Sequence, residues 1–279
     1  MNLFDIKGKI AVITGGGGEL CGTMAEALGN LGAKVAILDI NLEKANGREA
    51  SIKEKGGEAK AFGCDVLSED QLAEYYSIIT GLWGLPDILI NGAGGNDPRG
   101  STSKEILEID DIDLQEKKGF FNLTLEGFKY VFDLNFIGTF LTTKIFSRGM
   151  VKKKGGSIVN ISSMSAFTPL TKVAAYSSAK AAVSNFTKWL AVHFSHLGVR
   201  VNAIAPGFFM TEQLRFLQID QKTGELLPRA KKVIGHTPMG RYGNPEDLIG
   251  TLVWLVSGAS KFVTGIVVPV DGGFSSFTI

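Results

Sequence analysis

The sequence predicts an α/β fold: a single domain over residues 1–279, built around a doubly wound parallel sheet of about seven strands. Short apolar, β-branched runs alternate with helical stretches, and a parallel crossover needs such a helix to cover the sheet face. The length of 279 residues suits one large α/β domain. No repeat, low-complexity tract or Pro/Ser-rich linker in the sequence marks a second domain.

The expected strands are short runs of the kind that is buried on both faces of a parallel sheet. They cover residues 9–14, 34–39, 58–62, 87–90, 157–161, 200–204 and 266–270. The first helix begins near Leu20, because Leu20, Met24, Leu28 and Leu31 recur at helical spacing. Further helices are expected around residues 42–55 and 69–81.

Two stretches, residues 96–124 and 208–242, lack strong periodicity. Long irregular segments within α/β domains are frequently functional loops or lids. We therefore expect the second stretch, near residues 207–242, to be a substrate loop.

The composition excludes several classes of protein. Lys and Arg number 29 against 28 Asp and Glu, so a net charge of +1 argues against nucleic acid and anionic membranes as partners. The sequence has neither a membrane-spanning apolar run nor a secretory start, which favours the cytoplasm. Its two cysteines, Cys21 and Cys64, form no CxxC motif, so we expect neither a disulfide nor a metal site.

A glycine run, Gly15 to Gly18, follows the first expected strand. Such a turn lets a pyrophosphate approach the backbone and sit on a helix N-terminus, although it can also be a tight turn without a ligand. Asp39 ends the second strand, where a carboxylate accepts hydrogen bonds from an adenosine ribose and repels a 2′-phosphate. The alternative is a helix N-terminal role for Asp39, before Asn41. Together these features predict NAD rather than NADP.

Tyr176 and Lys180 lie four residues apart on an expected helix, so they share a face. An ammonium beside a phenol is expected to lower the phenol pKa and make Tyr176 an acid/base, although such pairs are also common on solvated helices. Ser163 stands thirteen residues before Tyr176, just past a strand, where parallel sheets place ligands. Ser162 points to the opposite face and is the weaker candidate.

With Asn135, these residues match the Asn–Ser–Tyr–Lys tetrad of the short-chain dehydrogenase/reductase family, which the chain resembles along nearly its whole length. Further matches are Asp65-Val66, Asn91-Gly92-Ala93-Gly94 in place of the usual NNAG, Pro206-Gly207 with Thr211, and Asp271-Gly272-Gly273. Glu19 and Cys21 depart from the family, because they stand where its TGxxxGxG motif has later glycines. We expect the phosphate loop to take a slightly different path there.

The resemblance implies a Rossmann fold and hydride transfer between NAD and an alcohol or ketone. Tyr176 would exchange a proton with the substrate oxygen, Ser163 would hydrogen-bond that oxygen, Lys180 would hold the nicotinamide ribose, and Asn135 would hold a water in a proton relay. The cofactor-binding residues implied are Gly15, Gly17, Gly18, Glu19, Leu20, Asp39, Asp65, Val66, Asn91, Ala93, Gly94, Tyr176, Lys180, Pro206, Gly207 and Thr211.

The loops resemble family members that act on sugar acids, interconverting D-fructuronate and D-mannonate or, alternatively, reducing 5-keto-D-gluconate. A nucleotide-binding protein without turnover is a third possibility, which an intact tetrad disfavours. Arg99 and Arg215 are candidates for the substrate carboxylate, or else surface residues, whereas Arg241 is expected to be structural. The resemblance also implies a homotetramer.

Overall fold

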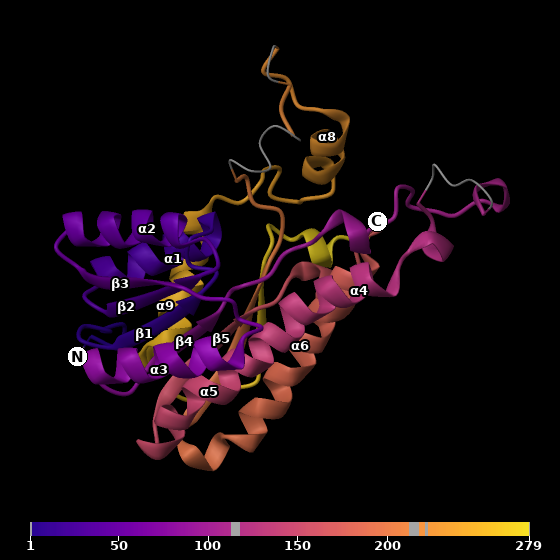
Figure 1. Cartoon of the computed structure of the whole chain (residues 1–279). Coiled ribbons are helices and arrows are strands. Elements are labelled where there is room, and N and C mark those ends of the chain that lie inside the picture. Colours follow the sequence, from indigo (N-terminus) through magenta and orange to yellow (C-terminus); the bar gives the residue numbers. More distant parts are fainter. Residues whose placement is uncertain (1, 113–117, 212–217, 221–222, 279) are drawn as a thin grey trace.

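The computed structural model describes residues 2–112, 118–211, 218–220 and 223–278, and shows one sheet with helices on both faces (Figure 1). All strand pairs are parallel, and their order is β3-β2-β1-β4-β5-β6-β7. The strands are β1 (Ile10–Thr14), β2 (Lys34–Asp39), β3 (Glu58–Gly63), β4 (Ile88–Asn91), β5 (Gly156–Ile161), β6 (Val199–Pro206) and β7 (Val267–Val270). The predicted doubly wound parallel sheet of about seven strands is confirmed.

The helices connect successive strands. They are α1 (Glu19–Asn30), α2 (Leu42–Glu54), α3 (Glu69–Trp83), α4 (Leu125–Phe132), α5 (Gly138–Lys152), α6 (Ala174–His193), α8 (Pro228–Gly235) and α9 (Ile249–Val256). In the part of the chain that the structure describes, no helix combines the length and apolar character needed to cross a bilayer.

The sheet separates two apolar cores. On one face, buried side chains of α1, α2 and α9, such as Met24, Ile52 and Leu252, pack against the strands. On the other face α3, α5 and α6 contribute residues that include Leu72 and Phe146. The inner strands, such as β1 and β4, are therefore buried on both sides, as their continuous apolar runs predict, whereas the edge strands β3 and β7 are partly exposed.

The strand order reverses between β1 and β4, because β1 pairs with both β2 and β4. Thr14, at the end of β1, lies opposite Leu38 of β2 and Asn91 of β4. Ligands of open α/β sheets bind at this kind of switch point, outside the carboxyl ends of the strands. The fold thus brings the glycine run and the loop after β4 to one place.

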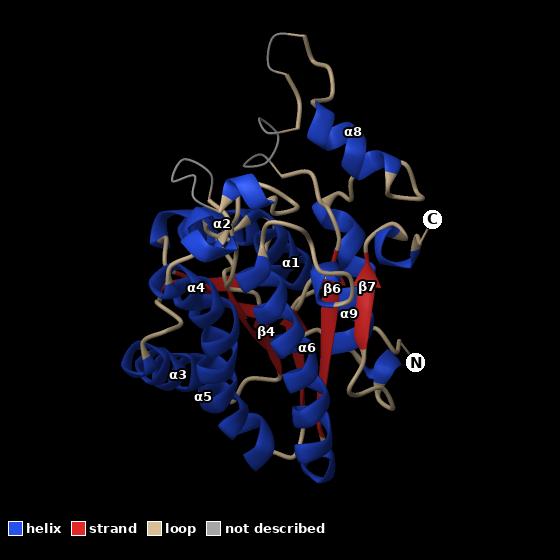
Figure 2. Cartoon of the chain, turned by 90° about the vertical axis from the view of Figure 1, so that its right-hand side faces the viewer, coloured by secondary structure: helices blue, strands red, loops and turns tan. Residues whose placement is uncertain are grey.

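The two irregular segments extend from the carboxyl edge of the sheet. Residues 96–112 and 118–124 belong to an arm beyond the start of α4 (Figure 1), and the segment after β6 contains α8, which stands away from the sheet (Figure 2). Lys232 of α8 joins the two, since its Nζ lies 2.9 Å from each carboxylate oxygen of Glu105. Both segments therefore flank the same end of the sheet.

Candidate active site

The turn after β1 packs tightly against the loop after β4. The Thr14 hydroxyl accepts hydrogen bonds from the backbone N–H of Gly92 at 3.1 Å and of Ala93 at 3.2 Å. Gly15 has a φ of +66°, and a Cβ there would lie 2.8 Å from the Ala93 nitrogen. Only glycine fits this position. Thr14 is absent from the residues proposed from the sequence, although its place before the glycine run was a usable signal.

Asp39 holds the glycine run in place from the end of β2. Its Oδ2 accepts a hydrogen bond from Gly17 N at 2.9 Å, and its Oδ1 accepts one from Asn41 N at 2.8 Å. The carboxylate therefore lies beside the glycine run and also just before α2, and its binding to a ribose stays a prediction. The residues fit an adenosine ribose at this place, because the carboxylate is fixed but still partly exposed.

Helix α1 presents its N-terminus to the switch point. Its N-cap is Gly18, which offers no capping side chain, so first-turn N–H groups are directed toward any anion that binds here. Glu19 is the first helical residue, and Leu20 packs against the core of the α1 face. The glycine cradle and this helix end fit a pyrophosphate.

Cys21 stands where the family motif has a glycine, and its side chain has room because position 92 is itself a glycine. The Cys21 side chain lies under Gly92, so that a Cβ at position 92 would overlap the sulfur and would also lie 2.8 Å from the Thr14 carbonyl oxygen. Burial raises the pKa of the Cys21 thiol to about 12, so the group is a neutral, space-filling one at neutral pH. This chain therefore differs from the usual family pattern at both contacting positions, with cysteine in place of glycine at 21 and glycine in place of asparagine at 92.

The loop after β3 provides a wall beside this site. The backbone N–H of Asp65 donates to the Gln71 side chain at 2.9 Å, and Asp65 Oδ1 accepts from Leu67 N at 2.9 Å. Val66 is buried against Gly138, where a Cβ would lie 2.7 Å from its Cγ2. These contacts fix the loop that carries Asp65 and Val66, and their contact with an adenine stays a prediction.

The Asn91 side chain is buried on the face of the sheet that α5 covers. Its Nδ2 lies 2.8 Å from Thr143 Oγ1 of α5 and 2.7 Å from Asn160 Oδ1 of β5. The side chain therefore links β4 to β5 and α5, and the role of Asn91 in cofactor binding stays a prediction. Sequence spacing could not show this, because the partners come from distant parts of the chain.

Asn135 joins the loop after β4 to the helices. It lies in a π-helical turn, Asp133–Ile137, and π-turns are frequent at functional sites. Its Nδ2 donates to the carbonyl oxygens of Gly95 and Val131, both at 2.7 Å, and its Oδ1 accepts from Gly95 N at 3.1 Å. The side-chain amide thus positions the loop.

Ser163 and Tyr176 meet at the end of β5. Ser163 caps a short 3₁₀ turn, with its Oγ accepting from Ser165 N at 3.2 Å. Burial raises the pKa of Tyr176, and a hydrogen bond with the Ser163 side chain acts in the opposite direction. The two hydroxyl groups are therefore adjacent, as a pair contacting one substrate oxygen must be.

Lys180 completes the tetrad from the next turn of α6. Its side chain is 4% exposed, and Nζ donates to the Ile161 carbonyl oxygen at 2.8 Å. A Cβ at Gly94 would lie 2.5 Å from Asn135 Oδ1 and 3.3 Å from Lys180 Nζ, so the loop after β4 touches both residues. The structure therefore brings all four predicted tetrad residues together.

A family model described as enoyl-(acyl carrier protein) reductase matches residues 20–275, most of the chain. The chain belongs to the short-chain dehydrogenase/reductase family. A *Bacillus subtilis* relative named uncharacterized oxidoreductase UxuB is 48% identical over 275 residues, which cover 98% of this chain and 97% of the relative.

Two further relatives are named for sugar acids. A *Haemophilus influenzae* structure, provisionally named a D-mannonate oxidoreductase and described with bound NAD, is 46% identical with a TM-score of 0.93, covering 98% of this chain and 97% of that one. A 2-dehydro-3-deoxy-D-gluconate 5-dehydrogenase from *Formosa agariphila* is 31% identical, covering 98% of this chain and 95% of the relative. The prediction of NAD as cofactor is confirmed by the Haemophilus structure.

The predicted direction of the Tyr176 pKa shift is wrong. The pKa of Tyr176 is raised because burial outweighs the Ser163 hydrogen bond. The Lys180 ammonium lies 5.6 Å from the center of the Tyr176 ring and is held by the Ile161 carbonyl. Burial in turn lowers the pKa of Lys180 to about 8, while Cys21 acts to raise it.

Replacing Lys180 with Met is expected to stabilise the protein by about 1 to 3 kcal/mol at pH 7, because a buried ammonium is unfavourable. The folded pKa of about 8 lies below the ordinary value of 10.5, so the stability of the parent rises with pH through that window. The advantage of K180M should therefore shrink between pH 8 and 10.5, as measured by urea unfolding. A K188M control on the exposed part of α6 should show no such gain, and equal or lower stability of K180M would contradict the prediction.

The Ser162 side chain has a structural role between β5 and α6. Its hydroxyl donates to the Lys180 carbonyl oxygen at 3.1 Å and lies 2.6 Å from the Ser184 hydroxyl. The weaker of the two serine candidates therefore binds α6 to β5, which leaves Ser163 beside Tyr176.

The loop after β6 places its predicted residues near the sheet edge. Gly207 N donates to the Val270 carbonyl oxygen at 2.9 Å, and a Cβ there would lie 2.6 Å from the Asp271 Cα. Pro206 ends β6, and Thr211 is partly buried in the loop that follows. Arg215 lies outside the described residues.

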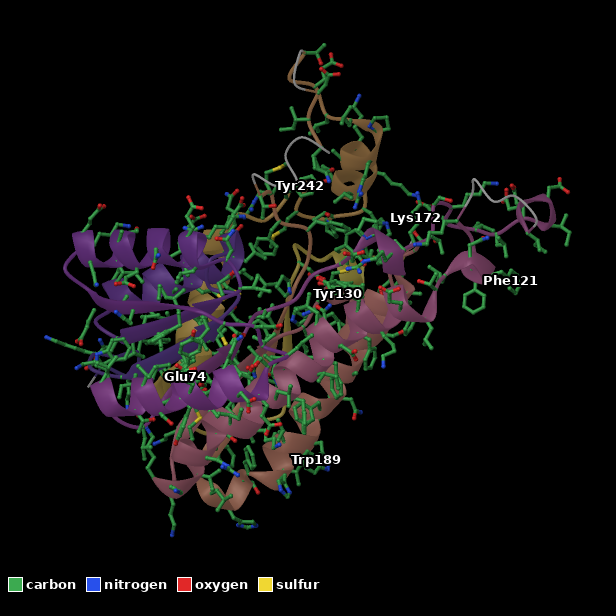
Figure 3. The ribbon with its side chains drawn as sticks, viewed as in Figure 1. Glu74, Phe121, Tyr130, Lys172, Trp189 and Tyr242 are labelled. Atoms are coloured by element: carbon green, nitrogen blue, oxygen red, sulfur yellow. The ribbon has the colours of Figure 1, made fainter. Side chains whose placement is uncertain are left out.

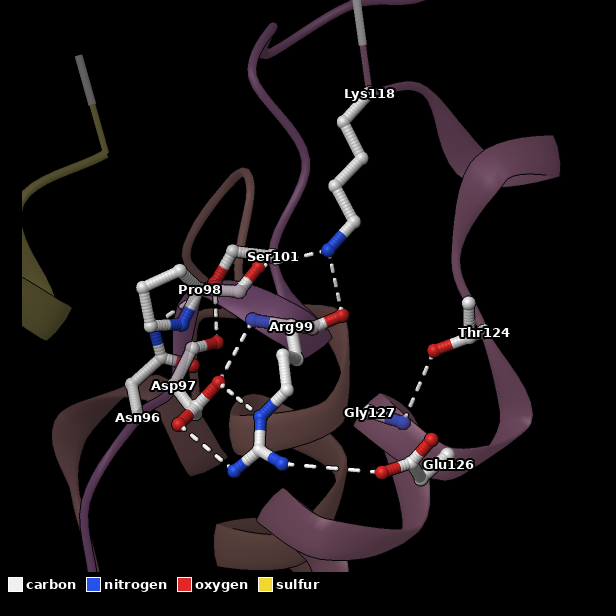
Figure 4. Close-up of polar contacts among 9 residues, drawn as sticks. All are labelled: Asn96, Asp97, Pro98, Arg99, Ser101, Lys118, Thr124, Glu126 and Gly127. Carbon is white, nitrogen blue, oxygen red and sulfur yellow. Dashed lines mark hydrogen bonds and ion pairs between the residues drawn. The ribbon is translucent and has the colours of Figure 1, made fainter.

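Arg99 already has an anionic partner (Figure 4). Its Nε and Nη2 donate to the two carboxylate oxygens of Asp97 at 2.9 and 3.2 Å, and its guanidinium carbon lies 4.0 Å from the Tyr130 ring center. Lys118 Nζ donates to the Arg99 carbonyl oxygen at 2.7 Å. Arg99 therefore fixes the base of the arm, and its charge is balanced before any substrate binds. Arg241 is likewise paired, with Asp247 at 2.6 Å, as its expected structural role requires.

Proposed function

We propose that this oxidoreductase interconverts D-fructuronate and D-mannonate with NAD. The observation that carries the proposal is the assembled tetrad beside a dinucleotide cradle, in a chain 46% identical to the *Haemophilus* protein provisionally named for D-mannonate. The same chemistry on 5-keto-D-gluconate is the second candidate, since a *Gluconobacter oxydans* relative named gluconate 5-dehydrogenase is 29% identical over 274 residues.

In this mechanism NAD supplies or accepts the hydride, and the chain supplies position and proton transfer. Tyr176 donates its phenol proton to the carbonyl oxygen during reduction. The phenol is protonated at neutral pH and can therefore act as the proton donor in the reducing direction. Ser163 stabilises the developing charge on the same oxygen. By the family resemblance, Lys180 would hold the nicotinamide-side ribose hydroxyls.

The test is NADH and NADPH oxidation by the purified protein with D-fructuronate, 5-keto-D-gluconate and a neutral ketose. We expect the highest kcat/KM for NADH with D-fructuronate. Activity confined to 5-keto-D-gluconate or the neutral sugar would overturn the substrate and keep the chemistry, whereas no activity on all three would favour a nucleotide-binding protein.

Replacing Asp39 with Ser is expected to raise KM for NADH about tenfold. It should also raise kcat/KM for NADPH, because the carboxylate that repels a 2′-phosphate is gone. The loss of the Gly17 hydrogen bond adds to the effect on NADH. Glu43→Ser on α2 is the matched control, and the coenzyme preference is read as the ratio of kcat/KM values. An unchanged ratio would contradict the role of Asp39.

We also propose a cytoplasmic homotetramer, with one interface on α5 and α6. Phe140, Trp189 and Val192 are exposed there by 40, 56 and 76%, and Trp189 stacks on Phe186 (Figure 3). A contiguous apolar face of this kind is typical of subunit contacts. W189E should lower the mass measured by sedimentation, whereas L82E on α3 should not; an unchanged mass for W189E would contradict this interface.

A further inference from the structure

A hollow of about 560 Å³ lies at the start of α6, beside the base of the arm. The side chains that line it are mostly small or apolar, and they include Ala166, Pro169, Leu170, Ala174, Ser178 and Ala181. Thr102 of the arm also lines it, and Thr102 N donates to the Lys172 carbonyl oxygen at 2.8 Å. The arm therefore forms one wall of the hollow, and this wall is held to the segment that precedes α6.

Bulky side chains lie toward the other end of α6, where Trp189 projects from the helix (Figure 3). Trp189 is 56% exposed and Val192 is 76% exposed. The Trp189 ring stacks on Phe186 and on His193, with ring centers 6.2 and 4.6 Å apart, so its orientation is fixed. Exposed aromatic side chains that bind another protein typically fill a pocket on it. The hollow has room for an indole, since cavities of about 300–1,000 Å³ enclose whole small molecules.

The arm and the far ends of α5 and α6 are opposite in charge. Residues 96–124 contain seven acidic and four basic side chains. Helices α5 and α6 contain no acidic residue in their sequences, and Arg148, Lys152 and Lys188 are exposed toward their ends. Two copies packed with these helices in the same direction would bring like charges together. The opposite direction brings the acidic arm of each copy to the basic helix ends of the other.

The arm also exposes large apolar side chains in a fixed arrangement. Lys104 Nζ donates to Glu108 at 2.7 Å and to Asp111 at 2.5 Å, which holds the arm together. Four apolar side chains are nevertheless at least 66% exposed, namely Ile106, Ile109, Phe120 and Phe121. Exposed apolar groups bordered by charged ones are typical of protein–protein contacts. A partner with both apolar and basic groups, such as the far end of α6, matches this surface.

We propose that a second copy of this chain docks here with its helices in the opposite direction, so that its Trp189 fills the hollow and the ends of its α5 and α6 lie along the arm. The contact is reciprocal, because a two-fold axis places the same patch on both copies. The proposal rests on the α5/α6 interface proposed above. It adds the direction of the helices, the pocket that receives Trp189 and a function for the arm.

Cross-linking of the full chain with a short bismaleimide tests the direction of packing. The double variant S178C/V192C should give a covalent dimer on a denaturing gel, because Ser178 lines the hollow and Val192 lies one turn beyond Trp189. Each single variant should stay monomeric on that gel, since its cysteine is then far from the same cysteine of the other copy. A covalent dimer from S178C alone would indicate helices in the same direction and would overturn the proposal, as would no dimer from the double variant.

Two controls accompany the cross-linking. The wild type should give no covalent dimer, because Cys21 and Cys64 are both buried. L82C places an exposed cysteine on α3, away from the proposed contact, and should also stay monomeric. Cross-linking of L82C as efficient as that of the double variant would show that the dimers come from random collision, which would overturn the proposal.

Sedimentation equilibrium tests the hollow separately from the interface. A181W fills the hollow and should raise the dissociation constant between copies about tenfold, whereas S77W on the exposed face of α3 should not change it. If W189E separates the copies and A181W does not, Trp189 binds elsewhere and only this proposal is overturned. An unchanged mass for W189E would overturn the α5/α6 interface as well.

The double variant F120S/F121S tests the arm. It should also weaken the association of the copies, because it removes two exposed rings from the proposed contact. The dissociation constant for NADH should stay that of the wild type, which shows that the variant is folded. Unchanged association of this variant would overturn the function of the arm.

Discussion

Replacing Tyr176 with Phe is expected to lower kcat about 10³-fold, with the dissociation constant for NADH nearly unchanged. The substitution removes the one oxygen that can exchange a proton with the substrate, and proton transfer by a positioned side chain contributes this order of rate. The ring stays, so its packing beside Lys180 is kept. Steady-state kinetics and fluorescence titration with NADH measure the two quantities separately.

The control for this variant is Y130F, which removes a phenol oxygen from the ring that Arg99 covers on α4. Its kcat should match that of the wild type. Turnover by Y176F within tenfold of the wild type would rule out Tyr176 as the acid/base, and a large loss of NADH affinity would show that the variant perturbs the cofactor site instead.

Replacing Gly92 with Asn, the residue usual in the family, is expected to destabilise this chain by about 3 kcal/mol. The new Cβ would overlap the Cys21 sulfur and crowd the Thr14 carbonyl oxygen. Neither neighbor can move far, because Cys21 is buried in α1 and Thr14 is hydrogen-bonded to the same loop. Urea unfolding followed by circular dichroism measures the loss.

The double variant G92N/C21G should recover part of that stability, because the sulfur is gone while the crowding at Thr14 remains. This coupling is the signature of direct contact in a double-mutant cycle. C64G is the matched control, since it removes the other buried cysteine, which packs in the core on the opposite face of the sheet. If C64G rescued G92N as well as C21G does, the contact between positions 21 and 92 would not explain the loss.

Much of the fold could be predicted because its signals are local. Strands such as β1 and β2 are nearly continuous apolar runs, and the glycine run directly follows the first of them. Three of the four tetrad residues, Ser163, Tyr176 and Lys180, lie on one strand end and one helix, and their spacing, with Asn135, was identified through the family resemblance. These are properties of neighboring residues in the chain.

The features that could not be predicted depend on partners distant in the sequence. The side chain of Asn91 is held between the sheet and α5 by Asn160 and Thr143, and the pKa of Tyr176 is raised by burial that no spacing reveals. Arg99 is a mixed case, since Asp97 lies two residues away but Tyr130 comes from α4. A candidate cation can be found from the sequence, but whether its charge is already balanced depends on the folded structure.

The contact between Cys21 and Gly92 also limits the order in which substitutions at these two positions can accumulate during evolution. If a larger side chain appears at position 92 while Cys21 is still present, the new Cβ overlaps the sulfur and the intermediate protein is destabilised. In the reverse order the intermediate has glycine at both positions. It contains only a small cavity where the Cys21 side chain was, which is less destabilising than an overlap. The accessible mutational route between this arrangement and the usual family one therefore begins at position 21.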